Sequence, residues 1–240
     1  MKHVLMAISV FAGVASAQHA DFGYVGEHGP AHWGGTCEIG VKQSPIDIKA
    51  PFAESKQALK PLYKEGGLTL ENNGHTLEVW VDDGSALEID KERYKLIRFH
   101  FHRPSEETIS GKPAAMTAHF VHLGEVSKKI VVLGVLLKEG KENATIQSIW
   151  AAQPEDKLKF STFKVGWRDK KINPAALLPA NLSYYMYEGS LTTPPCTEGV
   201  TFYILKEQVD ISKGQVEAFP FKLNARPVQK LGDRKVYSSK

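Results

Sequence analysis

Three histidines near the middle of the chain are placed so that they could share one metal ion. His100 and His102 are separated by a single residue, and His119 follows further along the chain. Because successive side chains of a β-strand point to opposite faces, His100 and His102 would lie on the same face. A turn at 110–113 would fold the next segment back alongside, so that His119 joins them. Three neutral imidazoles with one open position form a catalytic zinc site, although imidazole also binds copper, iron and nickel.

The segments that carry these histidines have the composition of β-strands. Runs rich in β-branched and aromatic residues lie between Asn-Gly, Asp-Gly and Ser-Gly turn signals. The expected strands are 76–81, 86–89, 94–102, 115–122, 130–137 and 200–205, and the expected short helices are 143–151, 174–178 and 212–219. The chain is therefore predicted to be mostly β with peripheral helices. On the second histidine strand, His122 is predicted to point away from His119.

The overall composition is that of an ordinary globular domain. Of the 240 residues, 42% are hydrophobic and 24% are charged, and the formal net charge is +3. There is no basic block and no interleaving of basic with aromatic residues, so no nucleic-acid partner is predicted. No segment after the N-terminus has the run of about 20 apolar residues that a membrane helix needs, so no membrane partner is predicted either.

The N-terminus is typical of a secretory signal peptide. A short basic start at 1–3 precedes an apolar run at 4–14, and 15–17 is a small-residue cleavage pattern. We predict cleavage after Ala17 and a periplasmic or secreted location. The two cysteines, Cys37 and Cys196, are then expected to form a disulfide rather than two free thiols, because exported proteins meet an oxidising environment.

Further motifs extend the pattern along almost the whole chain. The segments at 99–102 and 119–122 resemble the two metal-binding strands of α-carbonic anhydrases of the exported bacterial type. The other matching motifs, in the order of that family, lie at 22–24, 29–30, 33, 43–48, 72–75, 105–106, 190–195 and 224–227. The resemblance implies a zinc enzyme that interconverts carbon dioxide and bicarbonate. It also implies a single catalytic domain at 18–240, built on a large central twisted, mainly antiparallel sheet with short peripheral helices.

The resemblance assigns a role to each matching residue. Zn²⁺ would be bound by His100, His102 and His119, and its hydroxide would attack carbon dioxide. Thr192 would accept the proton of that hydroxide and donate its own hydroxyl proton to Glu106. Taken alone, without the resemblance, Thr192 is better interpreted as an ordinary turn hydroxyl and Glu106 as a solvated loop carboxylate.

Substrate and proton have separate implied routes. The apolar wall for carbon dioxide would consist of Val121, Val132, Leu191, Val200 and Phe202, with Thr193 beside bicarbonate. His75 matches the proton shuttle of the family. An imidazole with a pKa of about 6.5 suits that transfer. Tyr24, Asn72 and Asn73 would hold the connecting waters. Exported bacterial members are often dimers, so a homodimer is consistent with the resemblance.

The chain departs from the usual family pattern at four positions close to the site. Arg98 stands where a Gln usually precedes the first histidine, and Thr117 stands where a Glu often precedes the third. Glu107 replaces a frequent His, and Phe202 replaces a Trp of the pocket wall. Metal-bound histidines normally have their second ring nitrogen fixed by a neighbouring group, and the loss of such a partner costs about 10–100-fold in metal affinity or activity. We therefore expect an active enzyme with modest turnover.

Two alternatives use the same residues differently. In a cupin-like metalloprotein, Glu106 would be a fourth metal ligand beside the three histidines, and the metal would be iron or manganese. In a non-catalytic binding module with an anhydrase-like fold, at least one of the three histidines should be missing. All three are present.

Overall fold

The computed structural model of the chain describes residues 22–154 and 162–240. The predicted signal peptide at 1–17 lies outside the described residues. Within the described part, no helix combines the length and the apolar character needed to cross a membrane.

Strands make up most of the regular structure. They are β1 (Asp47–Ile48), β2 (Ala53–Glu54), β3 (Leu59–Leu62), β4 (Gly66–Asn72), β5 (Leu77–Val81), β6 (Ala86–Ile89), β7 (Glu92–His102), β8 (Thr108–Ile109), β9 (Lys112–Pro113), β10 (Met116–Gly124), β11 (Ile130–Glu139), β12 (Phe163–Ile172), β13 (Tyr184–Ser190), β14 (Glu198–Leu205), β15 (Val209–Ile211) and β16 (Tyr237–Ser238). The helices are η1 (Gly26–His28), η2 (Pro30–His32), α1 (Thr36–Ile39), α2 (Ala144–Trp150), η3 (Pro174–Leu177) and α3 (Lys213–Ala218), where η denotes a 3₁₀ helix.

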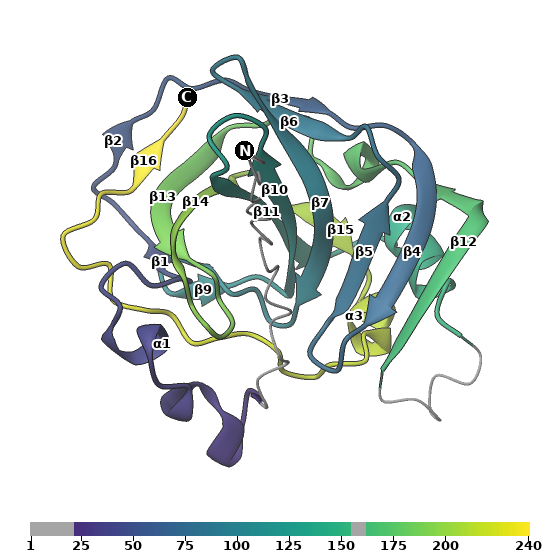
Figure 1. Cartoon of the computed structure of the whole chain (residues 1–240), viewed down its shortest axis with the longest axis horizontal. Helices are drawn as coiled ribbons and strands as arrows, with labels where there is room; N and C mark the ends of the chain where they lie inside the picture. The colour runs from purple at the N-terminus through teal and green to yellow at the C-terminus, as the bar shows by residue number, and fades with distance from the viewer. Residues whose placement is uncertain (1–21, 155–161) are drawn as a thin grey trace, which may run out of the picture.

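One large twisted sheet forms the body of the molecule (Figure 1). Its strands follow the order β12-β4-β5-β7-β10-β11-β14-β13-β16-β2, and β3, β6 and β15 join at the side. Most neighbours are antiparallel, whereas β11 runs parallel to β14 and β15, and β16 runs parallel to β2. The small sheet β1-β8-β9 is separate. The predicted mainly antiparallel sheet with short peripheral helices is confirmed.

The predicted helices form because each has its own N-terminal cap. The Asn143 side chain accepts hydrogen bonds from the backbone of the first turn of α2. Ser212 and Gln215 form a capping box at the start of α3. The segment at 174–178 forms only the 3₁₀ helix η3, which Asn173 caps. Figure 1 shows α2 and α3 at the side of the sheet where β4, β5 and β12 lie.

Three long strands were not predicted: β4, β12 and β13. β4 starts with two glycines, which are poor strand formers. β12 is rich in lysine and has an irregular register between Trp167 and Lys171. Both are held by their partners, since β12 pairs with β4 and β4 with β5. Tertiary pairing outweighs weak local propensity here.

The main core lies against one face of β7 and β10. Phe99, Phe101 and Phe120 are fully buried, and the rings of Phe99 and Phe120 stack with centroids 4.8 Å apart. Full burial of such a side chain stabilises the fold by about 1.5–3 kcal/mol. The core therefore fixes the two strands that carry the histidines on their other face.

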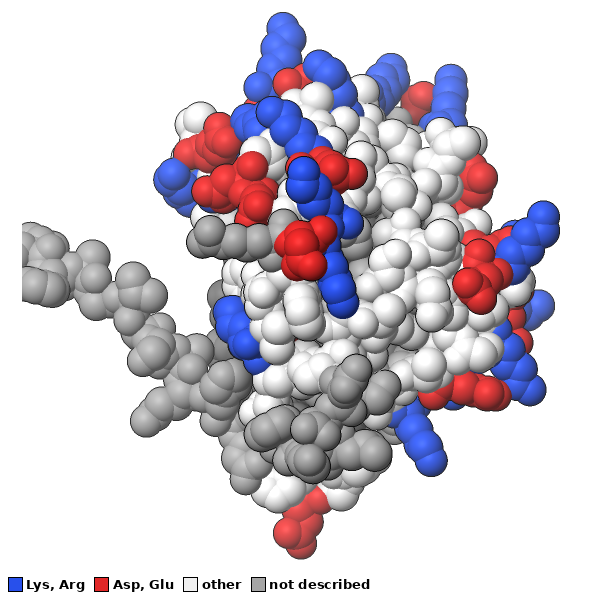
Figure 2. Space-filling view, turned by 90° about the vertical axis from the view of Figure 1, so that its right-hand side faces the viewer, with Lys and Arg blue, Asp and Glu red and all other residues white. Residues whose placement is uncertain are grey.

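The surface beside β12 and α2 carries charges of both signs. Figure 2 shows lysines and arginines next to aspartates and glutamates on this face, with uncharged surface between the groups. Exposed ion pairs of this kind stabilise by only about 0–1 kcal/mol each.

Candidate metal centre

The three histidines converge on one point of the sheet. β7 and β10 are antiparallel neighbours, and His100 lies directly opposite His119 in their register. One nitrogen from each of His100, His102 and His119 can be chosen so that all three lie within 4.8 Å of one another. The alternation of side chains along two paired strands thus produces the cluster that the sequence predicted.

Two of the three imidazoles are oriented by a hydrogen bond to their other nitrogen. Nδ1 of His102 donates to the backbone carbonyl of Asn224, at 2.7 Å. Nε2 of His119 lies 3.1 Å from Oε2 of Glu107. His102 Nε2 and His119 Nδ1 are therefore left for the centre. In the described part of the chain, Nδ1 of His100 has no hydrogen-bond partner. Arg98 cannot accept a hydrogen bond from it, and its Nε binds Oε1 of Glu78 at 3.0 Å.

Burial keeps two of these imidazoles neutral. Burial, together with the charge of a protonated His119, lowers the pKa of His102 to about 3, against the opposing effects of the Asn224 carbonyl and the Glu107 carboxylate. Burial, followed by the charges of the other two imidazoles and of Arg98, also lowers the pKa of His100. Burial opposes protonation of His119 as well, but the Glu107 carboxylate outweighs it and raises the pKa. Neutral imidazoles are the form that binds a metal.

The donor set fits a zinc ion. His102 is only 1% exposed, and its Nε2 has no hydrogen-bond partner among the described residues. A buried polar atom of this kind costs free energy unless a ligand satisfies it. The cluster contains three nitrogens and no carboxylate. Glu106 lies beside it, with Oε2 3.4 Å from His102 Nε2 and 3.7 Å from His119 Nδ1.

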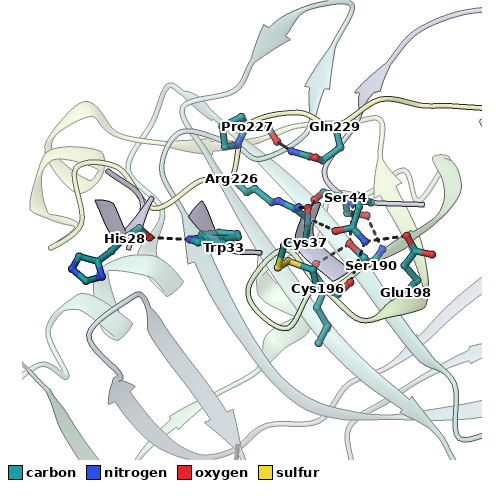
Figure 3. The surroundings of a disulfide bond; sticks show 12 residues. His28, Trp33, Cys37, Ser44, Ser190, Cys196, Glu198, Arg226, Pro227 and Gln229 are labelled. Atoms are coloured by element: carbon teal, nitrogen blue, oxygen red, sulfur yellow. Dashed lines mark hydrogen bonds between the residues drawn. A yellow bond between two sulfur atoms is a disulfide. The ribbon is translucent and has the colours of Figure 1, made fainter. Parts of the chain in front are cut away.

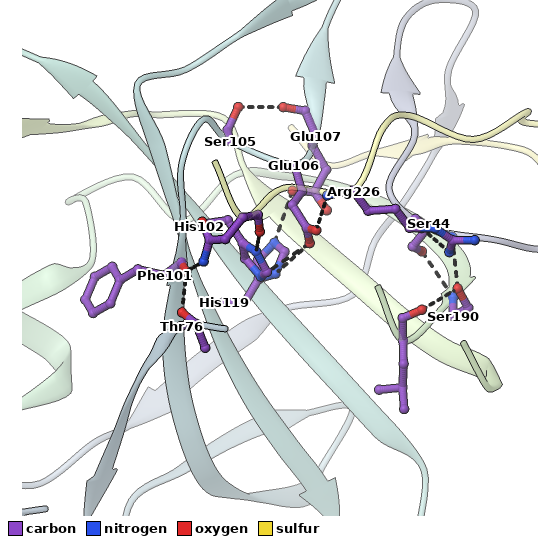
Figure 4. A network of polar contacts seen from close by, with 12 residues as sticks. Ser44, Thr76, Phe101, His102, Ser105, Glu106, Glu107, His119, Ser190 and Arg226 are labelled. Atoms are coloured by element: carbon purple, nitrogen blue, oxygen red, sulfur yellow. Dashed lines mark hydrogen bonds and ion pairs between the residues drawn. The ribbon is translucent and has the colours of Figure 1, made fainter. Parts of the chain in front are cut away.

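Glu106 is held by the chain segment that follows α3 (Figure 4). Its Oε1 accepts a hydrogen bond from the backbone N–H of Arg226, at 3.0 Å. Burial and, to a lesser degree, the charge of Glu107 raise the pKa of Glu106, whereas His119, the Arg226 N–H and the Thr192 hydroxyl lower it; the net pKa is about 7. Glu106 is therefore a buried carboxyl within reach of both Thr192 and the histidine cluster.

The histidines lie in a cavity of about 480 Å³. Most of the predicted site residues line it: Tyr24, Asn73, His75, Val121, Val132, Leu191, Thr192, Thr193 and Phe202. Asn72 and Val200 are not among the lining residues. Val200 is buried in a second core cluster beneath the wall, together with Val132 and Phe202.

His75 is carried by a turn that the two asparagines shape. Oδ1 of Asn73 accepts the backbone N–H groups of His75 and Thr76, and Oδ1 of Asn72 accepts that of Gly74. Gly74 has φ +89°, a conformation that favours glycine. The imidazole of His75 stacks on Phe22 with ring centroids 3.9 Å apart. The asparagines thus position the loop histidine through the backbone.

The predicted disulfide joins Cys37 to Cys196, across 159 residues (Figure 3). Arg226 extends from the Glu106 side towards it, and its guanidinium donates to the backbone carbonyls of Cys37 and Ser44 and to the side chain of Gln43. Gln43 in turn donates to the carbonyl of Cys196. The bridge therefore fixes the loop that follows Thr192 and Thr193 to the N-terminal segment.

Three residues that hold the site were not assigned a role from the sequence: Glu107, Asn224 and Arg226. Asn224 and Arg226 belong to a motif that was recognised at 224–227, but their partners His102 and Glu106 are 122 and 120 residues away. Glu107 was noted only as a departure from the usual pattern. Its proximity to Glu106 and the absence of a carboxylate at 117 were the available signals.

Comparisons with known proteins agree with this geometry. A family model described as eukaryotic-type carbonic anhydrase matches residues 28–240. The chain is 39% identical to a carbonic anhydrase of Neisseria gonorrhoeae, over 97% of this chain and 94% of that protein. A solved hyperthermostable carbonic anhydrase from a hydrothermal vent chimney is 41% identical, with a TM-score of 0.84, and the match covers 91% of this chain and all of that one. The α-carbonic anhydrase of Thermovibrio ammonificans, solved with sulfanilamide, is 41% identical with a TM-score of 0.81, over 91% and 98% of the two chains.

Proposed function

Because the chain belongs to the eukaryotic-type, or α, carbonic anhydrase family, we propose that it hydrates carbon dioxide reversibly at a zinc ion bound by His100, His102 and His119. The observation that carries this proposal is the convergence of three buried or half-buried imidazoles at the base of one cavity. The cupin-like alternative is not supported, since Glu106 lies outside the ligand cluster and the family is a different one. A binding module without metal ligands does not fit a complete cluster.

Zinc, when bound, supplies a Lewis acid that lets a coordinated water lose a proton near neutral pH, a property established on carbonic anhydrases themselves. His102 and His119 are already oriented for this task by Asn224 and Glu107. These two ligands therefore need little rearrangement to bind the ion.

Thr192 and Glu106 act as a pair that selects the orientation of the reacting group. The Glu106 carboxylate accepts the Arg226 N–H through Oε1. Its other oxygen, Oε2, is buried and makes no hydrogen bond of good geometry among the described residues, and we assign it to the hydroxyl of Thr192, which lowers the Glu106 pKa. Thr192 then presents only a lone pair to the cavity, so it accepts a proton from a neighbouring hydroxyl and disfavours ligands that cannot donate one.

Carbon dioxide is small and apolar, and the wall above the histidines suits it. Val121, Val132, Leu191 and Phe202 line this side of the cavity. Thr193 lines the same cavity next to Thr192 in the chain and is assigned to bicarbonate. Val200 contributes from below by supporting the wall.

His75 is the proposed proton shuttle. It lines the cavity together with Tyr24 and Asn73, where bridging waters can connect it to the centre. The hydrogen bonds of Asn72 and Asn73 with the turn keep the backbone of His75 at the cavity. An imidazole changes its protonation state near neutral pH, which is the requirement for passing protons to buffer.

Export is proposed from the disulfide together with the N-terminal sequence. A structural disulfide is typical of proteins that leave the cytoplasm. Cell fractionation with N-terminal sequencing of the mature protein should find the chain outside the cytoplasm and starting at Gln18. Uncleaved protein in the cytoplasm would contradict the export proposal.

The central test is zinc content together with stopped-flow hydration of carbon dioxide. We expect about one zinc ion per chain, loss of activity on chelation, and recovery with added zinc. His119→Gln should abolish zinc binding and activity, whereas the matched control His122→Gln, on the opposite face of the same strand, should retain both. Hydration that persists without zinc, or in His119→Gln, would refute the proposal.

A further inference from the structure

The third histidine of the cluster is the one held by a carboxylate, and this carboxylate comes from outside its own strand. Glu107 is fully buried, and its Oε2 lies 3.1 Å from His119 Nε2. The hydroxyl of Tyr187 donates to the other oxygen, Oε1, at 3.1 Å. Figure 4 shows Glu107 reaching His119 from the segment before β8, on the side of Glu106. Both oxygens of the carboxylate therefore have a donor.

Thr117 occupies the position in β10 from which the family often supplies a glutamate to the third histidine. It is fully buried and lies opposite His102 in the strand register. Its hydroxyl Oγ1 has no hydrogen-bond partner in the described part of the protein. Thr117 thus makes no hydrogen bond with His119. The acceptor for the imidazole N–H is Glu107 instead.

The loop that carries Glu107 is itself fixed. The Ser105 hydroxyl donates to the carbonyl of Glu107, at 2.7 Å, and accepts the backbone N–H of Ala114, at 2.8 Å. The next residue, Thr108, pairs with Asp47 in the β1–β8 ladder. Glu107 therefore has little freedom to leave His119, as a positioning residue requires.

We propose that Glu107 is the positioning residue of the third metal ligand, and that it replaces the carboxylate missing at Thr117. This inference rests on the proposed zinc site. By accepting the proton of Nε2, Glu107 holds His119 in the tautomer whose Nδ1 lone pair faces the centre. An anionic acceptor also makes the imidazole a stronger donor to a metal ion than a neutral one does. The carboxylate matters more here than usual, because His102 has a neutral carbonyl partner and His100 has Arg98 where an acceptor would stand.

The pair of substitutions at 107 and 117 provides a test by rescue. Zinc affinity is measured by competition with a chromophoric chelator, and zinc release is followed by stopped flow. Glu107→Gln should weaken zinc binding by about 10-fold and Glu107→Ala by up to about 100-fold. The double variant Glu107→His with Thr117→Glu moves the carboxylate to β10, and we expect zinc affinity within about threefold of the wild type. Glu107→His alone should remain weak.

The outcomes separate this inference from the proposed function. If the wild type binds zinc and the Glu107 variants bind it equally well, Glu107 is not a positioning residue. If the Glu107 variants lose zinc but the double variant does not regain it, the compensation between positions 107 and 117 is wrong. If the wild type itself binds no zinc, the proposed function fails and this inference falls with it. Circular dichroism of the zinc-free proteins identifies variants that merely fail to fold.

Discussion

The two faces of β7 and β10 use the same kinds of residue for opposite purposes. On the cavity face, His100, His102 and His119 direct nitrogens at one point. On the core face, the phenylalanines pack against one another, and His122 is as fully buried as they are. Strand alternation decides which face a residue takes, but it does not decide what a buried histidine does there.

His119 and His122 show what does decide it. His119 Nε2 meets the Glu107 carboxylate, which raises the imidazole pKa against the effect of burial. His122 Nε2 meets the hydroxyl of Tyr63, at 2.8 Å, and burial outweighs the backbone groups of Val131 and Phe120, so that its pKa falls to about 4. A histidine beside a carboxylate and an open cavity can serve a metal, whereas one enclosed by aromatic rings is a neutral part of the core.

The largest expected effect tests the core face. The pKa of His122 is about 4 in the folded state and about 6.5 in an unfolded chain. Its contribution to stability is therefore complete above pH 6.5 and is lost as the pH falls towards 4, which amounts to about 3 kcal/mol. His122→Gln should flatten the fall in unfolding free energy between pH 7 and pH 4 by about this amount. Urea unfolding of zinc-free protein measures it, and an unchanged pH dependence would show that His122 does not titrate in this range.

The next effect tests the cavity face. Thr192→Ala removes the hydroxyl proposed to link the reacting group to Glu106, and we expect kcat/KM for hydration to fall by about 100-fold. Zinc content should stay at about one per chain, because Thr192 is not a ligand. Thr192→Ser keeps the hydroxyl and should retain most of the activity. Equal loss in both variants would point to packing rather than to the hydroxyl.

The smallest effect tests the mouth of the cavity. His75→Ala should lower kcat by about 10-fold in dilute buffer and leave kcat/KM nearly unchanged, because proton release follows the hydration step. Added imidazole should restore kcat by acting as a diffusible base. His32→Ala, an exposed histidine on η2, serves as the control and should have no effect. A His75→Ala enzyme with wild-type kcat in dilute buffer would exclude the shuttle.

Much of the site could be predicted because it depends on the spacing of residues that are close together in the sequence. The spacing of His100 and His102, the alternation around His119 and the opposite orientation of His122 all follow from strand geometry. The helices at α2 and α3 could be predicted because Asn143 and Ser212 are strong local caps. The disulfide followed from the number of cysteines and the predicted signal peptide.

The rest depended on contacts across the fold. Nothing near His102 in the sequence indicates that the carbonyl of Asn224 would hold it. Glu106 and Glu107 are adjacent and chemically identical, yet one faces Arg226 and the other His119 and Tyr187. The loop conformation that separates them is fixed by Ser105 and by the pairing of β1 with β8, which no local pattern reveals. The asparagines before His75 likewise revealed their hydrogen bonds with the turn only in three dimensions.

Arg226 links two parts of the molecule that are usually considered separately. Its backbone N–H holds Glu106 at the reaction centre, and its guanidinium holds the carbonyls beside the cystine bridge. Reduction of that bridge would loosen the anchor of Arg226 and, through it, the alignment of the buried carboxyl. We therefore expect a chain retained in a reducing compartment to be a poorer catalyst as well as a less stable protein.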